Sequence, residues 1–66
     1  MKISVNGEPR DVPDGASVRD LLTALDVPLK AVAVEVNRCL VPRSLHAETA
    51  LAAGDAVEIV TLVGGG

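Results

Sequence analysis

The chain has 66 residues, of which 48% are hydrophobic, and it contains no Phe, Tyr or Trp. A chain of this length forms one small domain with an aliphatic core, which leaves little volume for a deep catalytic cleft. The net charge is −3, and the six Lys and Arg residues are scattered along the chain without aromatic residues that could stack on bases. Nucleic acid is therefore not an expected partner.

The composition also bears on the cellular compartment. The single cysteine, Cys39, excludes an intrachain disulfide, as is usual in a reducing cytosol. The first residues alternate in polarity instead of forming a charged and then apolar leader, and no apolar run is long enough to span a bilayer. We therefore expect a cytoplasmic protein that contacts no membrane and is monomeric when free.

The N-terminal segment predicts a β-hairpin. Residues 1–5 alternate between apolar and polar side chains, which is typical of a strand with one buried face. Asn6-Gly7 follows, and both residue types tolerate the positive φ of a tight hairpin turn. Residues 9–12 would form the returning strand, with Pro9 at its start or on a sheet edge.

A helix is predicted next. Ser17 is a suitable N-cap, and Asp20, three residues later, would complete a weak capping box. One apolar stripe at helical spacing follows, made of Val18, Leu21, Leu22 and Leu25. Pro28 is expected to end the helical region.

The second half of the chain is mostly extended, with strands expected at 31–36, 39–41 and 56–63. Residues 43–53 favour a loop with a short helical turn. The order ββαβββ predicts an α+β protein with the ubiquitin-like β-grasp fold, a mixed sheet of four to five strands packed on one helix. Its first and last strands would pair in parallel at the sheet centre. We expect a domain at 1–63 and a flexible tail at 64–66.

The tail consists of Gly64, Gly65 and Gly66. Extended, it would reach on the order of 10 Å as a thin probe with a carboxylate at its tip. A carboxylate anion is a poor electrophile, so it must be activated before it can accept sulfur, for instance as an acyl-adenylate made from ATP. A sulfur nucleophile could then displace AMP and leave a thiocarboxylate. Three glycines alone are more typical of a disordered chain end or a cloning remnant.

Four segments carry a resemblance to a known family, namely VAVEVN at 32–37, VPRS at 41–44, GDAVEIV at 54–60 and VGGG at 63–66. With these segments in this order and spacing, essentially the whole chain resembles the ThiS family, the sulfur carriers of the thiamine pathway. The resemblance implies that the chain is a protein co-substrate rather than an enzyme, and that it binds no cofactor of its own.

The resemblance also implies partners and a site. An E1-like adenylyltransferase (ThiF-like) would use ATP to adenylate Gly66, with Gly65 as a required neighbour. A sulfur donor such as a cysteine desulfurase would supply the sulfur, and a thiazole synthase (ThiG-like) would consume the Gly66 thiocarboxylate. Family members often carry an aromatic residue or histidine directly before the glycines, where this chain has Thr61-Leu62.

Strand alternation predicts a docking surface next to the tail. If Val57 and Ile59 face the helix, then Glu58, Val60 and Leu62 face the opposite side of the sheet, which a single helix cannot cover. These residues would contact partner proteins. The alternative is that Val60 and Leu62 are ordinary surface apolar residues.

The remaining candidates are weaker. Cys39, beside Leu40 and Val41, fits a partly buried small hydrophobe better than a nucleophile or a persulfide site. His46 is the only histidine, so a clustered metal site is not expected, and a Cys39–His46 dyad lacks an orienting third group. Three other functions stay open: a molybdopterin-synthase small subunit, a ubiquitin-like protein modifier and a plain interaction module.

Overall fold

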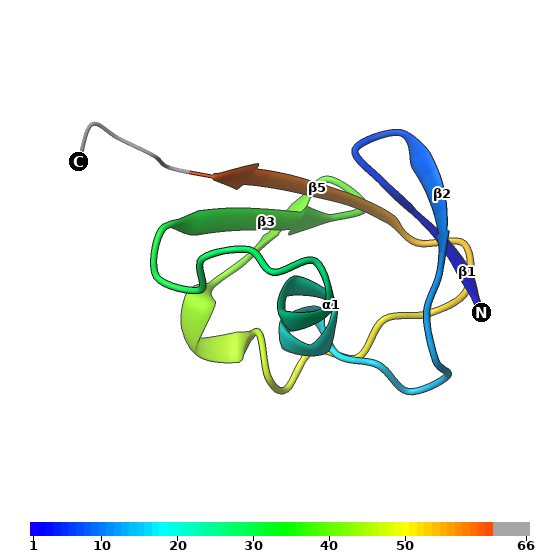
Figure 1. Ribbon diagram of the computed structural model, residues 1–66, viewed down its shortest axis with the longest axis horizontal. Helices are drawn as coiled ribbons and strands as arrows, with labels where there is room; N and C mark the ends of the chain where they lie inside the picture. Colours follow the sequence, from blue (N-terminus) through cyan, green and yellow to red (C-terminus); the bar gives the residue numbers. More distant parts are fainter. Residues whose placement is uncertain (62–66) are drawn as a thin grey trace.

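The computed structural model describes residues 1–61, which form a two-layer domain of one sheet and one helix (Figure 1). In chain order the elements are β1 (Lys2–Val5), β2 (Glu8–Asp11), α1 (Val18–Ala24), β3 (Val32–Val36), β4 (Cys39–Val41), the short 3-10 helix η1 (Arg43–Leu45) and β5 (Ala56–Thr61). The expected short helical turn in 43–53 is therefore η1. Every predicted strand is present, and each starts within one residue of its expected position.

The sheet has the strand order β2-β1-β5-β3-β4. β1 and β5 pair in parallel, whereas β1 with β2, β3 with β5, and β3 with β4 pair antiparallel. This arrangement confirms the predicted β-grasp fold with its first and last strands side by side at the centre. β2 is an edge strand, so Pro9 lies inside it without removing a central hydrogen bond.

Both hairpins use turns in which the two central residues have positive φ. Asn6 and Gly7 have φ of 51° and 85°, as predicted, and Asn37 and Arg38 have φ of 52° and 69°. Turns of this kind match the right-handed twist of the flanking strands, which explains why they connect strands so tightly. Arg38 has a Cβ atom in a conformation that glycine adopts more readily.

The capping box at the start of α1 is present. The Ser17 backbone N–H donates to the Asp20 carboxylate at 2.9 Å, and the Asp20 N–H donates to the Ser17 hydroxyl at 3.1 Å. The helix does not run to Pro28 as predicted. It ends because Asp26 adopts a left-handed conformation (φ 57°), with Asp26 N–H bonded to Thr23 O and Val27 N–H bonded to Leu22 O.

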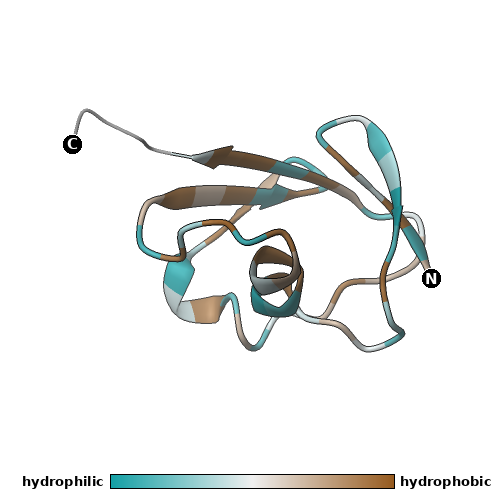
Figure 2. Cartoon of the chain, in the orientation of Figure 1, coloured by the Kyte–Doolittle hydropathy of each residue, from teal (hydrophilic) through white to brown (hydrophobic). Residues whose placement is uncertain are grey.

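The core lies between α1 and one face of the sheet and is entirely aliphatic. Its buried residues are Ile3, Val12, Ala16, Val18, Leu21, Leu22, Val32, Val34, Val41, Leu51 and Val57. Figure 2 shows that β3 and β5 are apolar along most of their length, whereas β2 is largely hydrophilic. Among residues 1–61, no helix has the length and apolar character needed to cross a membrane.

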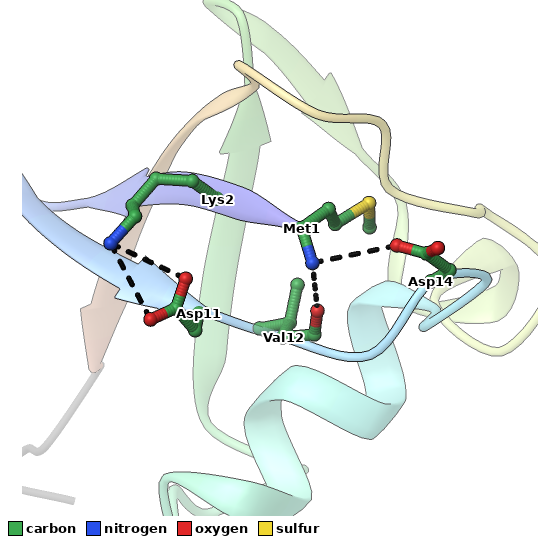
Figure 3. A network of polar contacts seen from close by, with 5 residues as sticks. All are labelled: Met1, Lys2, Asp11, Val12 and Asp14. Carbon is green, nitrogen blue, oxygen red and sulfur yellow. Dashed lines mark hydrogen bonds and ion pairs between the residues drawn. The ribbon is translucent and has the colours of Figure 1, made fainter.

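Polar contacts close the edge of the sheet at β1 and β2 (Figure 3). The Met1 amino group donates to Val12 O at 2.6 Å and forms an ion pair with Asp14 at 3.4 Å. Lys2 pairs with Asp11 at 3.3 Å, and both side chains are exposed to solvent. These contacts lie at the opposite end of the sheet from the last residue of β5.

Candidate functional site

The candidate site is built around β5, the strand that leads into the glycines. The predicted acceptor Gly66, its neighbours Gly64 and Gly65, and the docking residue Leu62 lie outside the described residues. The predicted division into a domain at 1–63 and a tail at 64–66 therefore stays a prediction. At about 3.3–3.6 Å per residue, the five residues after Thr61 limit the distance from Thr61 to the end of Gly66 to about 18 Å.

β5 is paired on both sides at its start and on one side up to its last described residue, Thr61. On one side it is parallel to β1, with Ser4 opposite Ala56. On the other side it is antiparallel to β3 over five residue pairs, ending with Val32 opposite Thr61. The sheet therefore holds the strand up to the point where the chain continues toward the glycines.

Two asparagine side chains extend this pairing beyond the strands. At the first turn, the Asn6 amide accepts from Ile59 N–H at 2.8 Å and donates to Ile59 O at 3.2 Å, as a strand residue would. At the second turn, Asn37 accepts from Ala56 N–H at 3.0 Å and donates to the Asp55 carboxylate at 3.0 Å. The two turns thus hold β5 at its first residue, Ala56, and at its middle, Ile59. Sequence inspection identified Asn6 only as a turn former, since the partners of both asparagines are remote in the chain.

The predicted alternation along β5 is confirmed within the described residues. Val57 is 1% exposed and faces the helix, whereas Val60 is 58% exposed and lies with Glu58 on the uncovered face. We call this surface the open face, and it also carries Ala33 opposite Val60, and Leu40, which is 66% exposed. Val60 lies next to the end of β5, whereas Leu40 is on β4, separated from β5 by β3.

Two glutamates share the open face with these aliphatic residues. Glu35 of β3 and Glu58 of β5 are directly opposite each other in the ladder. Like charges in this position repel and destabilise the sheet. Arg38 lines the same shallow hollow as Glu58, yet the two ion pairs formed among residues 1–61 involve neither glutamate. The open face is therefore both apolar and negatively charged.

Cys39 and His46 do not form a site. Cys39 is exposed on the edge strand β4, contrary to the partly buried position expected from its apolar neighbours. His46 is 4% exposed, and its ring Nε2 donates to Val41 O at 3.0 Å. No hydrogen bond joins the two side chains, and residues 1–61 contain no cluster of three or more potential metal ligands.

The pattern of one sequence family matches the chain from residue 3 to residue 66, and that family is ThiS. The chain belongs to the ThiS family. The crystal structure of the thiamine biosynthesis protein ThiS from Geobacter metallireducens is 38% identical in sequence, with a TM-score of 0.84 over 100% of both chains. The family's β-grasp fold is therefore the fold of this chain.

Two further relatives of different lengths are similar to the whole chain. The chain is 39% identical over 66 residues to the uncharacterized protein ycf40 of Porphyra purpurea and covers 93% of it. It is 44% identical over 66 residues to a protein named thiazole synthase from Paramagnetospirillum magneticum. The chain spans about a fifth (20%) of the length of that relative. The match therefore covers only one part of that larger relative.

Proposed function

We propose that this member of the ThiS family is a sulfur carrier for the thiamine pathway and has no turnover of its own. The observation that carries the proposal is the family match, which extends through residue 66 and so includes the three glycines. The match to proteins named thiazole synthase supports a thiazole synthase as the enzyme that consumes the sulfur.

The proposed chemistry takes place on the Gly66 carboxylate. A carboxylate oxygen attacks the α-phosphorus of ATP on an E1-like adenylyltransferase, pyrophosphate leaves, and an acyl-adenylate forms. The outer sulfur of a persulfide, formed on a donor such as a cysteine desulfurase, then attacks the carbonyl carbon, the bond to AMP breaks, and an acyl disulfide forms. A thiol reduces its S–S bond and is itself oxidised to a disulfide, which releases the thiocarboxylate with one oxygen exchanged for sulfur.

The fold supports this role in two ways. β5 is hydrogen-bonded as far as Thr61, so a partner that binds the domain finds the residue from which the chain continues toward the glycines at a defined position. The open face, with Glu58 and Val60, lies beside that point, and we propose that it docks the partner together with Leu62. A partner that recognises this face needs basic groups for the glutamates and apolar groups for Val60.

Intact-mass analysis tests the sulfur-acceptor role. The chain is incubated with the adenylyltransferase, ATP and a sulfur donor, and we expect the mass gain of one sulfur-for-oxygen exchange, located on Gly66 by fragmentation. Deleting Gly66, or adding residues after it, should abolish the gain because no carboxylate then lies at the required reach.

A Cys39→Ser variant is the matched control, since Cys39 is the other group that could hold sulfur. This variant should gain sulfur normally. A gain that survives deletion of Gly66, or that disappears in Cys39→Ser, would show that the sulfur is carried elsewhere.

A further inference from the structure

A basic hollow lies on the helix side of the molecule, away from the open face. It is an open depression of about 380 Å³ lined by Arg19, Leu29, Lys30, Arg43 and His46. Arg19 comes from α1, Lys30 from the loop before β3, and Arg43 from η1. Three of the six Lys and Arg residues, scattered in the sequence, are therefore gathered at one place.

Hydrogen bonds to the backbone hold the walls of the basic hollow together. The Arg43 guanidinium donates through Nη1 to Lys30 O at 3.1 Å, which joins η1 to the loop before β3. The Arg19 N–H donates to His46 O at 3.0 Å, which joins α1 to the segment after η1. The buried His46 ring, bonded to Val41 O, forms part of the lining. The three cationic side chains are therefore carried by backbone segments that hydrogen bonds hold in place relative to one another.

The cations of the basic hollow have no carboxylate partner among residues 1–61. Both ion pairs in that part of the chain lie at the β1–β2 edge, where they involve Met1 and Lys2. Arg19 contributes to lowering the pKa of Asp20, but that carboxylate is held mainly by Ser17. Three gathered like charges repel one another, and an incoming anionic group relieves this repulsion.

The position of the basic hollow indicates which partner protein supplies the anionic group. Leu29 and Lys30 directly precede β3, whose first residue, Val32, is paired with Thr61 at the end of β5. The basic hollow is therefore at the end of the sheet where the described chain stops (Figure 1). Any protein that receives Gly66, at most about 18 Å from Thr61, covers this end of the molecule.

We infer that the basic hollow docks acidic side chains of the adenylating partner, an inference that rests on the proposed function. The open face presents two glutamates and exposed aliphatic groups, whereas the basic hollow presents three cations on the other side of the sheet. Two patches of opposite charge flanking one strand end allow only one orientation of the partner. Charged patches of this kind accelerate association and set its dependence on salt.

Association kinetics with the adenylyltransferase test the inference. The exposed residues Arg19 and Lys30 are changed together to Gln, and Arg43 is left intact because it bonds to the backbone. At low salt we expect the association rate constant to fall about tenfold and its salt dependence to flatten.

Lys2→Gln is the control, and it is compared with the single changes Arg19→Gln and Lys30→Gln. It removes one positive charge from the β1–β2 edge, and the exposed Lys2–Asp11 pair contributes little to stability. It should leave the association rate within about twofold of the unaltered chain. Thermal unfolding of each variant shows that the fold is retained.

Three outcomes would overturn the inference. The first is an unchanged association rate constant in the Arg19 and Lys30 double variant. The second is a loss in Lys2→Gln equal to that in Arg19→Gln or Lys30→Gln. The third is saturable binding of inorganic phosphate in the hollow that leaves the rate of association with the adenylyltransferase unchanged. Failure of the proposed function is distinguishable from these, because there Gly66 gains no sulfur even when the unaltered chain binds its partner normally.

Discussion

At the scale of single residues, the two hairpin turns differ in how well their residues suit the backbone. Within residues 1–61, four residues other than glycine have positive φ, namely Asn6, Asp26, Asn37 and Arg38. Asparagine and aspartate tolerate this conformation because their short polar side chains bond locally. Arg38 has no such compensation, since it forms no ion pair among residues 1–61.

Replacing Arg38 with glycine is expected to stabilise the domain. At a φ of 69° the Cβ atom crowds the backbone, and its removal should raise the free energy of unfolding by about 1 kcal/mol. For a domain of this size that corresponds to a rise in Tm of about 4–8 °C. Urea and thermal unfolding measure the change. Arg38→Ala keeps the Cβ atom and should not show the gain; equal stability of the Gly and Ala variants would contradict the explanation.

His46 shows how a residue's role can depend on contacts that no motif reveals. In the sequence it is a single histidine between Leu45 and Ala47. In the structure its ring donates to Val41 O, and its backbone carbonyl accepts from Arg19 N–H. His46 therefore links η1, β4 and α1 structurally, and a role as metal ligand or catalytic base is not needed to explain it.

At the scale of elements, α1 is short and relies on its ends. Seven residues are too few for a stable isolated helix, so packing and the two caps must maintain it. At its start, two hydrogen bonds from Ser17 hold the pKa of the Asp20 carboxyl below its ordinary value of 3.8. The bond from the Ser17 backbone N–H lowers this pKa most, and the bond from the Ser17 hydroxyl comes second.

The lowered pKa of Asp20 predicts how the stability changes with pH. Since the folded-state pKa lies below the unfolded value, the ionised carboxylate stabilises the fold above pH 3.8, and this contribution is lost as the pH falls through the lower folded-state pKa. Asp20→Asn keeps an oxygen acceptor for Ser17 but has no charge. Urea unfolding should therefore show the native chain to be more stable than Asp20→Asn at neutral pH, with the difference vanishing in acid. A difference independent of pH would exclude the carboxylate as its source.

At the scale of the whole molecule, the sheet has one covered and one uncovered side. The helix and the loops bury the side that carries Val34 and Val57, which leaves Leu40 and Val60 exposed on the other. Isolated exposed aliphatic residues are common, but here Val60 lies on the strand that leads to Gly66. It shares this face with two glutamates that form no ion pair among residues 1–61. This combination is the basis for the proposed docking role of the open face.

Val60→Asp tests that role. A carboxylate at this position would be buried without a partner in the complex, so adenylation of Gly66 should slow by at least about tenfold while the Tm changes little. Ala53→Asp, in the exposed turn whose Gly54 N–H donates to Lys2 O, adds the same charge away from both the open face and the basic hollow and should leave the adenylation rate unchanged. An unaltered rate in Val60→Asp would remove Val60 from the docking surface.

The sequence by itself determined the elements, their order and the β-grasp topology, because alternation along strands, the apolar stripe of α1 and the Asn6-Gly7 turn are local signals. It also determined the side on which Glu58 and Val60 lie, since strand periodicity is two. Only the tertiary structure decided which remote residues meet. Sheet register decides that the Asn6 side chain bonds to Ile59 and that Glu35 lies opposite Glu58. Chain reversal brings together the cations of the basic hollow, Arg19, Lys30 and Arg43. These arrangements are non-local, and no short stretch of sequence encodes them.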